Sequence, residues 1–145
     1  MLDAGSVILS ANKGDLILES GSLIDVSGAR GQIDQFTTTG VQTIAIAGAG
    51  GEISLQAREG MAVNGSLLGK AASVPGAAAG RLSIGLDLYD RTINPNGALG
   101  GGAGIYPTQD RILTLTSDPV TGLPTAPANG TARISARQLQ AGGFD

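Results

Sequence analysis

The sequence predicts an all-β chain built as a solenoid, in which short strands stack in successive turns. Glycine supplies 24 of the 145 residues, well above the usual share of about 7%, and charged residues make up 14% against about 25% in typical domains. Many glycine corners and few charges favour short strands. In addition, the stretch 5–28 returns in altered form at 51–69, and a repeat of this length is typical of stacked architectures.

The first copy contains three short apolar strands separated by corners. Alternation puts Val7, Leu9 and Ala11 of the strand 6–11 on one face. Residues 12–15 form a corner, and 16–19 form a second strand whose facing is left open by three consecutive aliphatic residues. After a corner at Gly21-Ser22, the third strand covers 23–27. Three strands in so short a segment predict one turn of a solenoid.

The second copy aligns with the first at two offsets. Four residues of the first copy, Val7, Leu9, Ala11 and Gly14, recur 46 positions later as Ile53, Leu55, Ala57 and Gly60. Gly21-Ser22-Leu23 recurs as Gly65-Ser66-Leu67, at an offset of 44. Because side chains alternate faces along a strand, a change of two residues keeps inward positions inward. The alignment therefore predicts that Val7 lies beside Ile53 and Leu23 beside Leu67.

Further strands are expected at 32–38, 41–47, 81–87, 111–117 and 131–136. In the last of them, Ala132, Ile134 and Ala136 would take the positions of Ile53, Leu55 and Ala57, at an offset of 79. Residues 70–80 are rich in small side chains and include the turn pair Pro75-Gly76, which predicts a loop. Residues 137–141 fit either a further strand or a short helical cap.

The chain is expected to form a single β-helical segment, 1–145, with two long loops near 88–110 and 118–130. The first loop is irregular and glycine-rich, and the second contains several prolines. Insertions in solenoids collect on one side of the stack. These two loops are therefore the predicted surfaces for any direct binding.

Composition excludes several classes of site. The chain has no Cys and no His, which removes disulfides, thiolate and imidazole metal sites, and Ser-His-Asp triads. The net charge of -3 with nine scattered basic residues opposes nucleic-acid binding, which needs clustered Lys or Arg. No apolar run approaches the ~18 residues of a transmembrane helix. We expect neither a cofactor nor a metal.

Paired carboxylates are the remaining route to catalysis, since a glycosidase places an acid and a base on either side of the sugar bond. The candidates are Asp87 with Asp90, and Glu52 with Glu59. Only Tyr89 offers an aromatic platform near them, and charges at strand ends are usually solvated. We therefore expect no catalytic residues; a carbohydrate-active β-helix enzyme or a phage-type fibre module is the alternative hypothesis.

Two asparagines stand near corners that the alignment makes equivalent. Asn12 and Asn64 would either stack as a ladder between neighbouring turns or each satisfy the backbone of its own turn. The sequence leaves both interpretations open.

The stretches GDLILESGSLIDVSG, GGEISLQAREG and NGTARISARQ resemble the large exoproteins of bacterial two-partner secretion, the filamentous haemagglutinin family. The resemblance implies a right-handed parallel β-helix, export of the full-length protein by a dedicated outer-membrane transporter, and a role in adhesion. The chain shows neither a signal sequence nor the amino-terminal secretion motif of that family. We therefore expect an internal piece of the shaft.

The expected function is that of a non-catalytic structural and adhesive segment, secreted or held at the bacterial cell surface. Its expected partners are the transporter, a receptor on a host or bacterial cell, and further copies of the chain that stack on exposed strand ends.

Overall fold

The structure, a computed structural model, describes residues 3–86, 104–108, 117–124 and 130–145. The described elements are β1 (Ser6–Ala11), β2 (Leu16–Leu18), β3 (Leu23–Asp25), β4 (Arg30–Thr37), β5 (Gly40–Ala47), β6 (Glu52–Ala57), β7 (Gly60–Val63), β8 (Ser66–Leu68), β9 (Arg81–Leu86), β10 (Gly104–Thr108), β11 (Thr131–Ser135) and α1 (Ala136–Gly142). Strands dominate and the described helix is short, so the predicted all-β class is confirmed. No described helix has the length and apolar character needed to cross a membrane.

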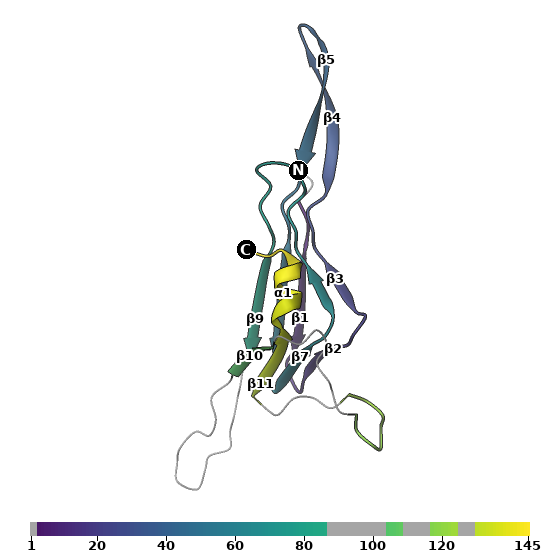
Figure 1. Cartoon of the computed structure of the whole chain (residues 1–145), viewed down its shortest axis with the longest axis vertical. Helices are drawn as coiled ribbons and strands as arrows, with labels where there is room; N and C mark the ends of the chain where they lie inside the picture. Colours follow the sequence, from purple (N-terminus) through teal and green to yellow (C-terminus); the bar gives the residue numbers. More distant parts are fainter. Residues whose placement is uncertain (1–2, 87–103, 109–116, 125–129) are drawn as a thin grey trace.

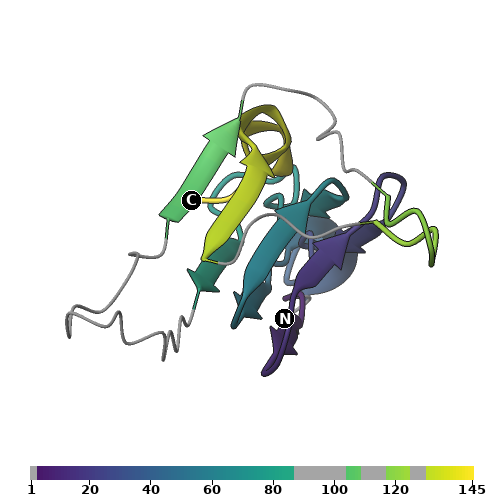
Figure 2. The ribbon, with the colours of Figure 1, turned by 90° about the horizontal axis from the view of Figure 1, so that it is seen from below.

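Parallel pairing brings the two sequence copies side by side. β1 pairs with β6, β2 with β7 and β3 with β8, each pair parallel. We call β1, β2 and β3 the first layer and β6, β7 and β8 the second layer. Figure 2 shows the purple strands of the first layer beside the teal strands of the second.

The register between β1 and β6 is the one predicted. Val7 lies opposite Ile53, 46 positions later, and the remaining pairs of the two strands follow at the same spacing. In β2, Leu16 and Leu18 pack against the core, which settles the facing that the sequence left open.

The predicted offset of 44 for the third strands is wrong. Leu23 lies opposite Ser66, and Ile24 lies opposite Leu67. Leu23 is 61% exposed, whereas Ile24 packs against the core. The inward positions of one strand do not determine those of the next strand, because the corner residues between them do not follow the two-residue alternation of strands. Each strand therefore aligns by its own inward residues.

The predicted place of 131–136 is also wrong. β9 occupies the expected position beside β6, with Leu82 opposite Ile53. β11 lies beside β7, with Ala132 opposite Met61, and Ala136 begins α1. Alternating aliphatic residues specify which side of a strand faces inward, but they fit either sheet equally well. The free edge of β7 decides the placement.

The core lies between the sheets and is most complete in the second layer. Its buried hydrophobic side chains are Val26, Ile53, Leu55, Ala57, Met61, Val63, Leu67, Ala132 and Ile134. The inward side chains of the first layer pack against this core but are only partly buried, namely Val7, Leu9, Ala11, Leu16, Leu18 and Ile24. A layer thus becomes dry when layers lie on both of its sides.

Helix α1 follows β11 and packs against β8. Ser135 is its N-cap and accepts a hydrogen bond from the backbone N–H of Gln138 at 3.4 Å, as capping serines do. The side-chain amide of Gln138 donates to the carbonyl oxygen of Asn64 at 2.8 Å. Of the two predictions for 137–141, the helical cap is the one confirmed.

The predicted loop near 88–110 is wrong in part, because it contains β10. β10 lies parallel to β11, with Ile105 opposite Ala132. A strand forms here because the edge of β11 offers unpaired backbone groups. The other residues of this loop fall outside the described residues, and so do the candidate acids Asp87 and Asp90. Nearly all of the strand expected at 111–117 also lies outside them.

The strands expected at 32–38 and 41–47 are confirmed as β4 and β5, and they form an antiparallel hairpin. Figure 1 shows this hairpin extending away from the stacked strands. β6 follows β1 by 46 residues, while β9 follows β6 by 29. The difference, 46 − 29 = 17 residues, nearly equals the length of the hairpin 30–47. The hairpin is therefore an insertion between two layers.

Glycines meet where the hairpin joins the layers. The backbone N–H of Gly51 donates to Val26 at 2.7 Å, and its carbonyl accepts from Arg81 at 2.9 Å. A Cβ at Gly51 would overlap the carbonyl oxygen of Gly5, and one at Gly80 would overlap that of Gly51. These backbones lie so close together that only glycine fits between them.

Candidate functional site

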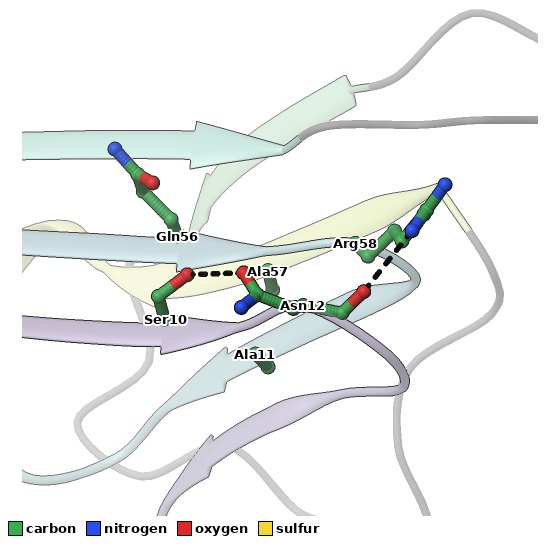
Figure 3. A pocket seen from close by; sticks show the side chains of 6 residues that line it. All are labelled: Ser10, Ala11, Asn12, Gln56, Ala57 and Arg58. Atoms are coloured by element: carbon green, nitrogen blue, oxygen red, sulfur yellow. Dashed lines mark hydrogen bonds between the residues drawn. The ribbon is translucent and has the colours of Figure 1, made fainter.

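A polar pocket lies at the corner that follows β1 and β6 (Figure 3). Its volume is about 180 Å³, and its lining residues are Ser10, Ala11, Asn12, Gln56, Ala57 and Arg58. The register of the two strands builds it, since Ser10 lies opposite Gln56 and Ala11 opposite Ala57. Asn12 and Arg58 come directly after these strands, at the same corner in the two layers.

Hydrogen bonds fix the polar groups of this pocket. The Ser10 hydroxyl donates to Oδ1 of Asn12 at 2.9 Å, and Nη1 of Arg58 donates to the carbonyl oxygen of Asn12 at 3.2 Å. The lining therefore offers a hydroxyl, two amides and one guanidinium. Such groups bind polar molecules, but the lining holds no carboxylate that could serve with them as general acid or base.

Glu52 and Glu59 do not form the acid pair considered from the sequence. Glu52 is the first residue of β6, and Glu59 lies two residues beyond the end of that strand at Ala57. At about 3.3 Å per residue, β6 alone separates its two ends by about 16 Å. Glycosidase carboxyl groups stand roughly 5–10 Å apart.

The structure instead brings Glu59 close to Asp15. The backbone N–H of Glu59 donates to the carbonyl oxygen of Gly14 at 3.1 Å. Desolvation, and secondly the charge of Glu59, raise the pKa of Asp15 above its usual value. The two acids stand in different sequence copies, so this pair follows only from the pairing of layers. Within the described ranges, no cluster of three or more His, Cys, Asp or Glu side chains is arranged to hold a metal.

Asp15→Asn is expected to raise the free energy of unfolding at pH 7. A folded pKa above the unfolded one means that the folded chain disfavours the ionised carboxyl, and this cost disappears as the pH falls through the folded pKa. Because Asp15 is exposed, solvent screening limits the gain to about 0.5 kcal/mol. Urea titrations at a series of pH values should show the variant ahead at neutral pH and level with the wild type in acid.

Asp25→Asn provides a control of opposite sign. Hydrogen bonds from the side chain and then the backbone of Ser27 lower the pKa of Asp25, with the backbone N–H at 2.8 Å from its carboxylate. Its stabilising effect is present at neutral pH and is lost as the pH falls through the folded pKa. The Asp25 variant should thus be less stable than the wild type at pH 7. Equal shifts in both variants would contradict these assignments.

The Asn12 and Asn64 ladder is wrong. Asn12 follows β1 and contacts Arg58, whereas Asn64 follows β7 and its backbone N–H donates to Leu18 at 2.8 Å. The two residues therefore belong to different corners, one after β1 and one after β7. The side chain of Asn12 accepts a hydrogen bond from Ser10.

The loop predicted at 118–130 begins with a tight turn. The carboxylate of Asp118 accepts hydrogen bonds from the N–H groups of Val120 at 2.7 Å and Thr121 at 2.9 Å. These bonds, that of Thr121 first, lower the pKa of Asp118. Val120 is 90% exposed and Leu123 65% exposed. The turn thus displays two aliphatic side chains to solvent; residues 125–129 lie outside the described part.

The polar pocket, the corner with Asp15 and Glu59, and the turn that displays Val120 are candidate binding features of the described surface. Only the turn falls within a segment that the sequence marked as a binding surface, because the other two depend on how the layers pair. The chain matches no protein-family model, no curated protein and no solved structure.

Proposed function

We propose that this chain is a non-catalytic structural segment of a secreted bacterial surface exoprotein, folded as a right-handed parallel β-helix. One observation carries the proposal: aliphatic residues form rows that run from layer to layer. Val7, Ile53 and Leu82 form one row, and the next inward positions of the same strands form others. Each layer buries its row against its neighbours, at about 25 cal/mol per Å² of apolar surface. Stability then grows along the stack, as a shaft requires.

The adhesive part of the proposed function belongs to the segments that leave the stack. The turn at 117–124 is closed by a bridge between Ser117 and Pro124, so it holds Val120 and Leu123 in the solvent at little further cost in entropy. Exposed apolar side chains on a preformed turn are suited to contact a receptor on a host or bacterial cell. The resemblance to filamentous haemagglutinins supports the same role, with an outer-membrane transporter as the partner of the full-length protein.

Cell retention tests this function. Immobilised protein should retain intact bacterial cells or cultured epithelial cells, and the double variant Val120→Ser with Leu123→Ser should weaken retention about tenfold, the loss typical of a hot spot. Ile8→Ser is the matched control, because Ile8 is 68% exposed on strand β1 of the stack. Far-UV circular dichroism should show unchanged β structure in both variants.

Two results would overturn the proposal. Release of reducing ends from polysaccharides by the purified chain would favour the carbohydrate-active alternative. Retention that falls equally in the Ile8 variant and in the double variant would show that the displayed turn is not the adhesive surface.

A further inference from the structure

The hairpin β4–β5 has no neighbouring strand in the described part of the chain. Its strands pair only with each other, from Arg30 opposite Ala47 to Thr37 opposite Gly40, and the hairpin extends beyond the stack (Figure 1). An isolated two-stranded hairpin is marginal in water and gains stability from a third strand or a cover. Both outer edges of this hairpin present unpaired backbone groups.

Strand β5 carries none of the devices that usually protect an exposed edge, such as charged side chains, Pro or a bulge. The segments 30–37 and 40–47 contain no Lys and no Pro, and the register runs without a bulge. β4 holds Arg30 and Asp34, whereas β5, GVQTIAIA, holds no charged residue. Short uncharged segments of high β propensity without Pro pair readily with copies of themselves. The outer edge of β5 therefore suits a second copy of the same strand.

The hairpin also exposes apolar side chains. Ile33 lies opposite Ile44 and is 49% exposed, and on the other face Phe36 lies opposite Val41, at 84% and 59% exposed. Pairing with a further strand would shield part of this surface on both faces of the hairpin.

We propose that two copies of this chain associate through β5, edge to edge and antiparallel, about a two-fold axis at Ile44. The product is a four-stranded sheet with the two β4 strands outside. Residues that lie directly opposite share a face, so Ile44 of each copy meets the other and extends the row that begins at Ile33. The net charge of -3 lies outside β5, and no charge in this strand opposes the contact. This inference is independent of the proposed adhesive role.

A single introduced cysteine tests the register, because the chain has none of its own. Ile44→Cys should form a disulfide-linked dimer under mild oxidation, since opposed Cβ atoms lie about 4.5–5.5 Å apart, close to the disulfide range. Gln35→Cys is the control on the same face of β4, where three strand spacings separate the copies by about 14 Å. Non-reducing gels should show at least about tenfold more dimer for Ile44→Cys. Equal cross-linking would overturn the register.

Sedimentation equilibrium tests the association itself. Wild-type mass should rise from 14.3 kDa toward twice that value with concentration. Ala45→Lys should raise the dissociation constant at least about tenfold, because it places like charges beside the two-fold axis. Gln35→Lys makes the same charge change on the outer strand and should leave the constant unchanged.

A shortened variant separates this contact from the others. Replacing residues 31–46 by Asn-Gly keeps Arg30 and Ala47 paired across a tight turn, and should abolish the dimer while preserving the β signal. A wild type that stays monomeric throughout the series would overturn the proposal. So would a shortened variant that still dimerises, because the contact would then lie elsewhere, such as at the open first layer.

Discussion

Gly51→Ala is expected to lower the free energy of unfolding by at least about 3 kcal/mol, the upper range of overpacking. The new Cβ would overlap the carbonyl oxygen of Gly5, and this oxygen accepts a hydrogen bond from the backbone N–H of Glu52 at 3.3 Å. Gly51 also links layers through its hydrogen bonds with Val26 and Arg81. A shift that relieves the overlap would therefore strain both bonds.

Gly5→Ala is the matched control from the other side of the same contact. A Cβ at Gly5 meets nothing within 4 Å, and its φ is not among the positive ones. Alanine there should stabilise the chain by up to about 1 kcal/mol through the unfolded state. Urea unfolding followed by circular dichroism should give midpoints that move in opposite directions. Similar midpoints for the two variants would show that the layers do not approach so closely at this corner.

The pairing of β1 with β6 could be predicted from the sequence because both strands carry aliphatic residues at every second, inward position. Val7 and Leu9 share one face, and the other face of β1 carries Ser6 and Ser10 beside the exposed Ile8. The same inward spacing recurs at Ile53 and Leu55. A one-residue slip would expose the whole row to solvent. Hydrophobic patterning therefore specifies this register on its own.

The same patterning could not place β11 or the hairpin. Alternation determines which residues face inward, but not which strand lies alongside, so Ala132 and Ile134 fit β6 and β7 equally well. For 30–37 and 40–47, alternation predicts two strands, but it does not show that β4 and β5 extend away from the stack. Which edge remains free depends on the complete chain path.

The polar pocket and the pair formed by Asp15 and Glu59 could not be predicted from the sequence, for a related reason. Both features bring together residues from two layers at a corner, and corner lengths differ: β2 pairs with β7 at a spacing of 45, from Leu16 to Met61. A single repeat offset therefore misplaces residues that lie past a corner. Register information for each sheet separately is what these sites require.

Leu55→Ala is expected to lower the free energy of unfolding by about 2–5 kcal/mol, whereas Leu9→Ala should cost no more than about half as much. The two leucines lie opposite each other in β6 and β1, so the substitution and the strand environment are matched. Leu55 is fully buried between layers, and its removal leaves a cavity. Leu9 is only partly buried, so solvent can fill the space left by its side chain.

Urea titrations of both variants, performed below the concentration at which the wild type associates, measure this difference. Equal losses would mean that the first layer is already covered on its open side. Leu9→Ala as the more damaging change would contradict the layer order itself. The expected inequality, by contrast, gives the open layer a physical meaning: a further layer of strands laid over β1 would bring the cost of losing Leu9 up to that of Leu55. Each added layer of a shaft would stabilise the one below it in this way.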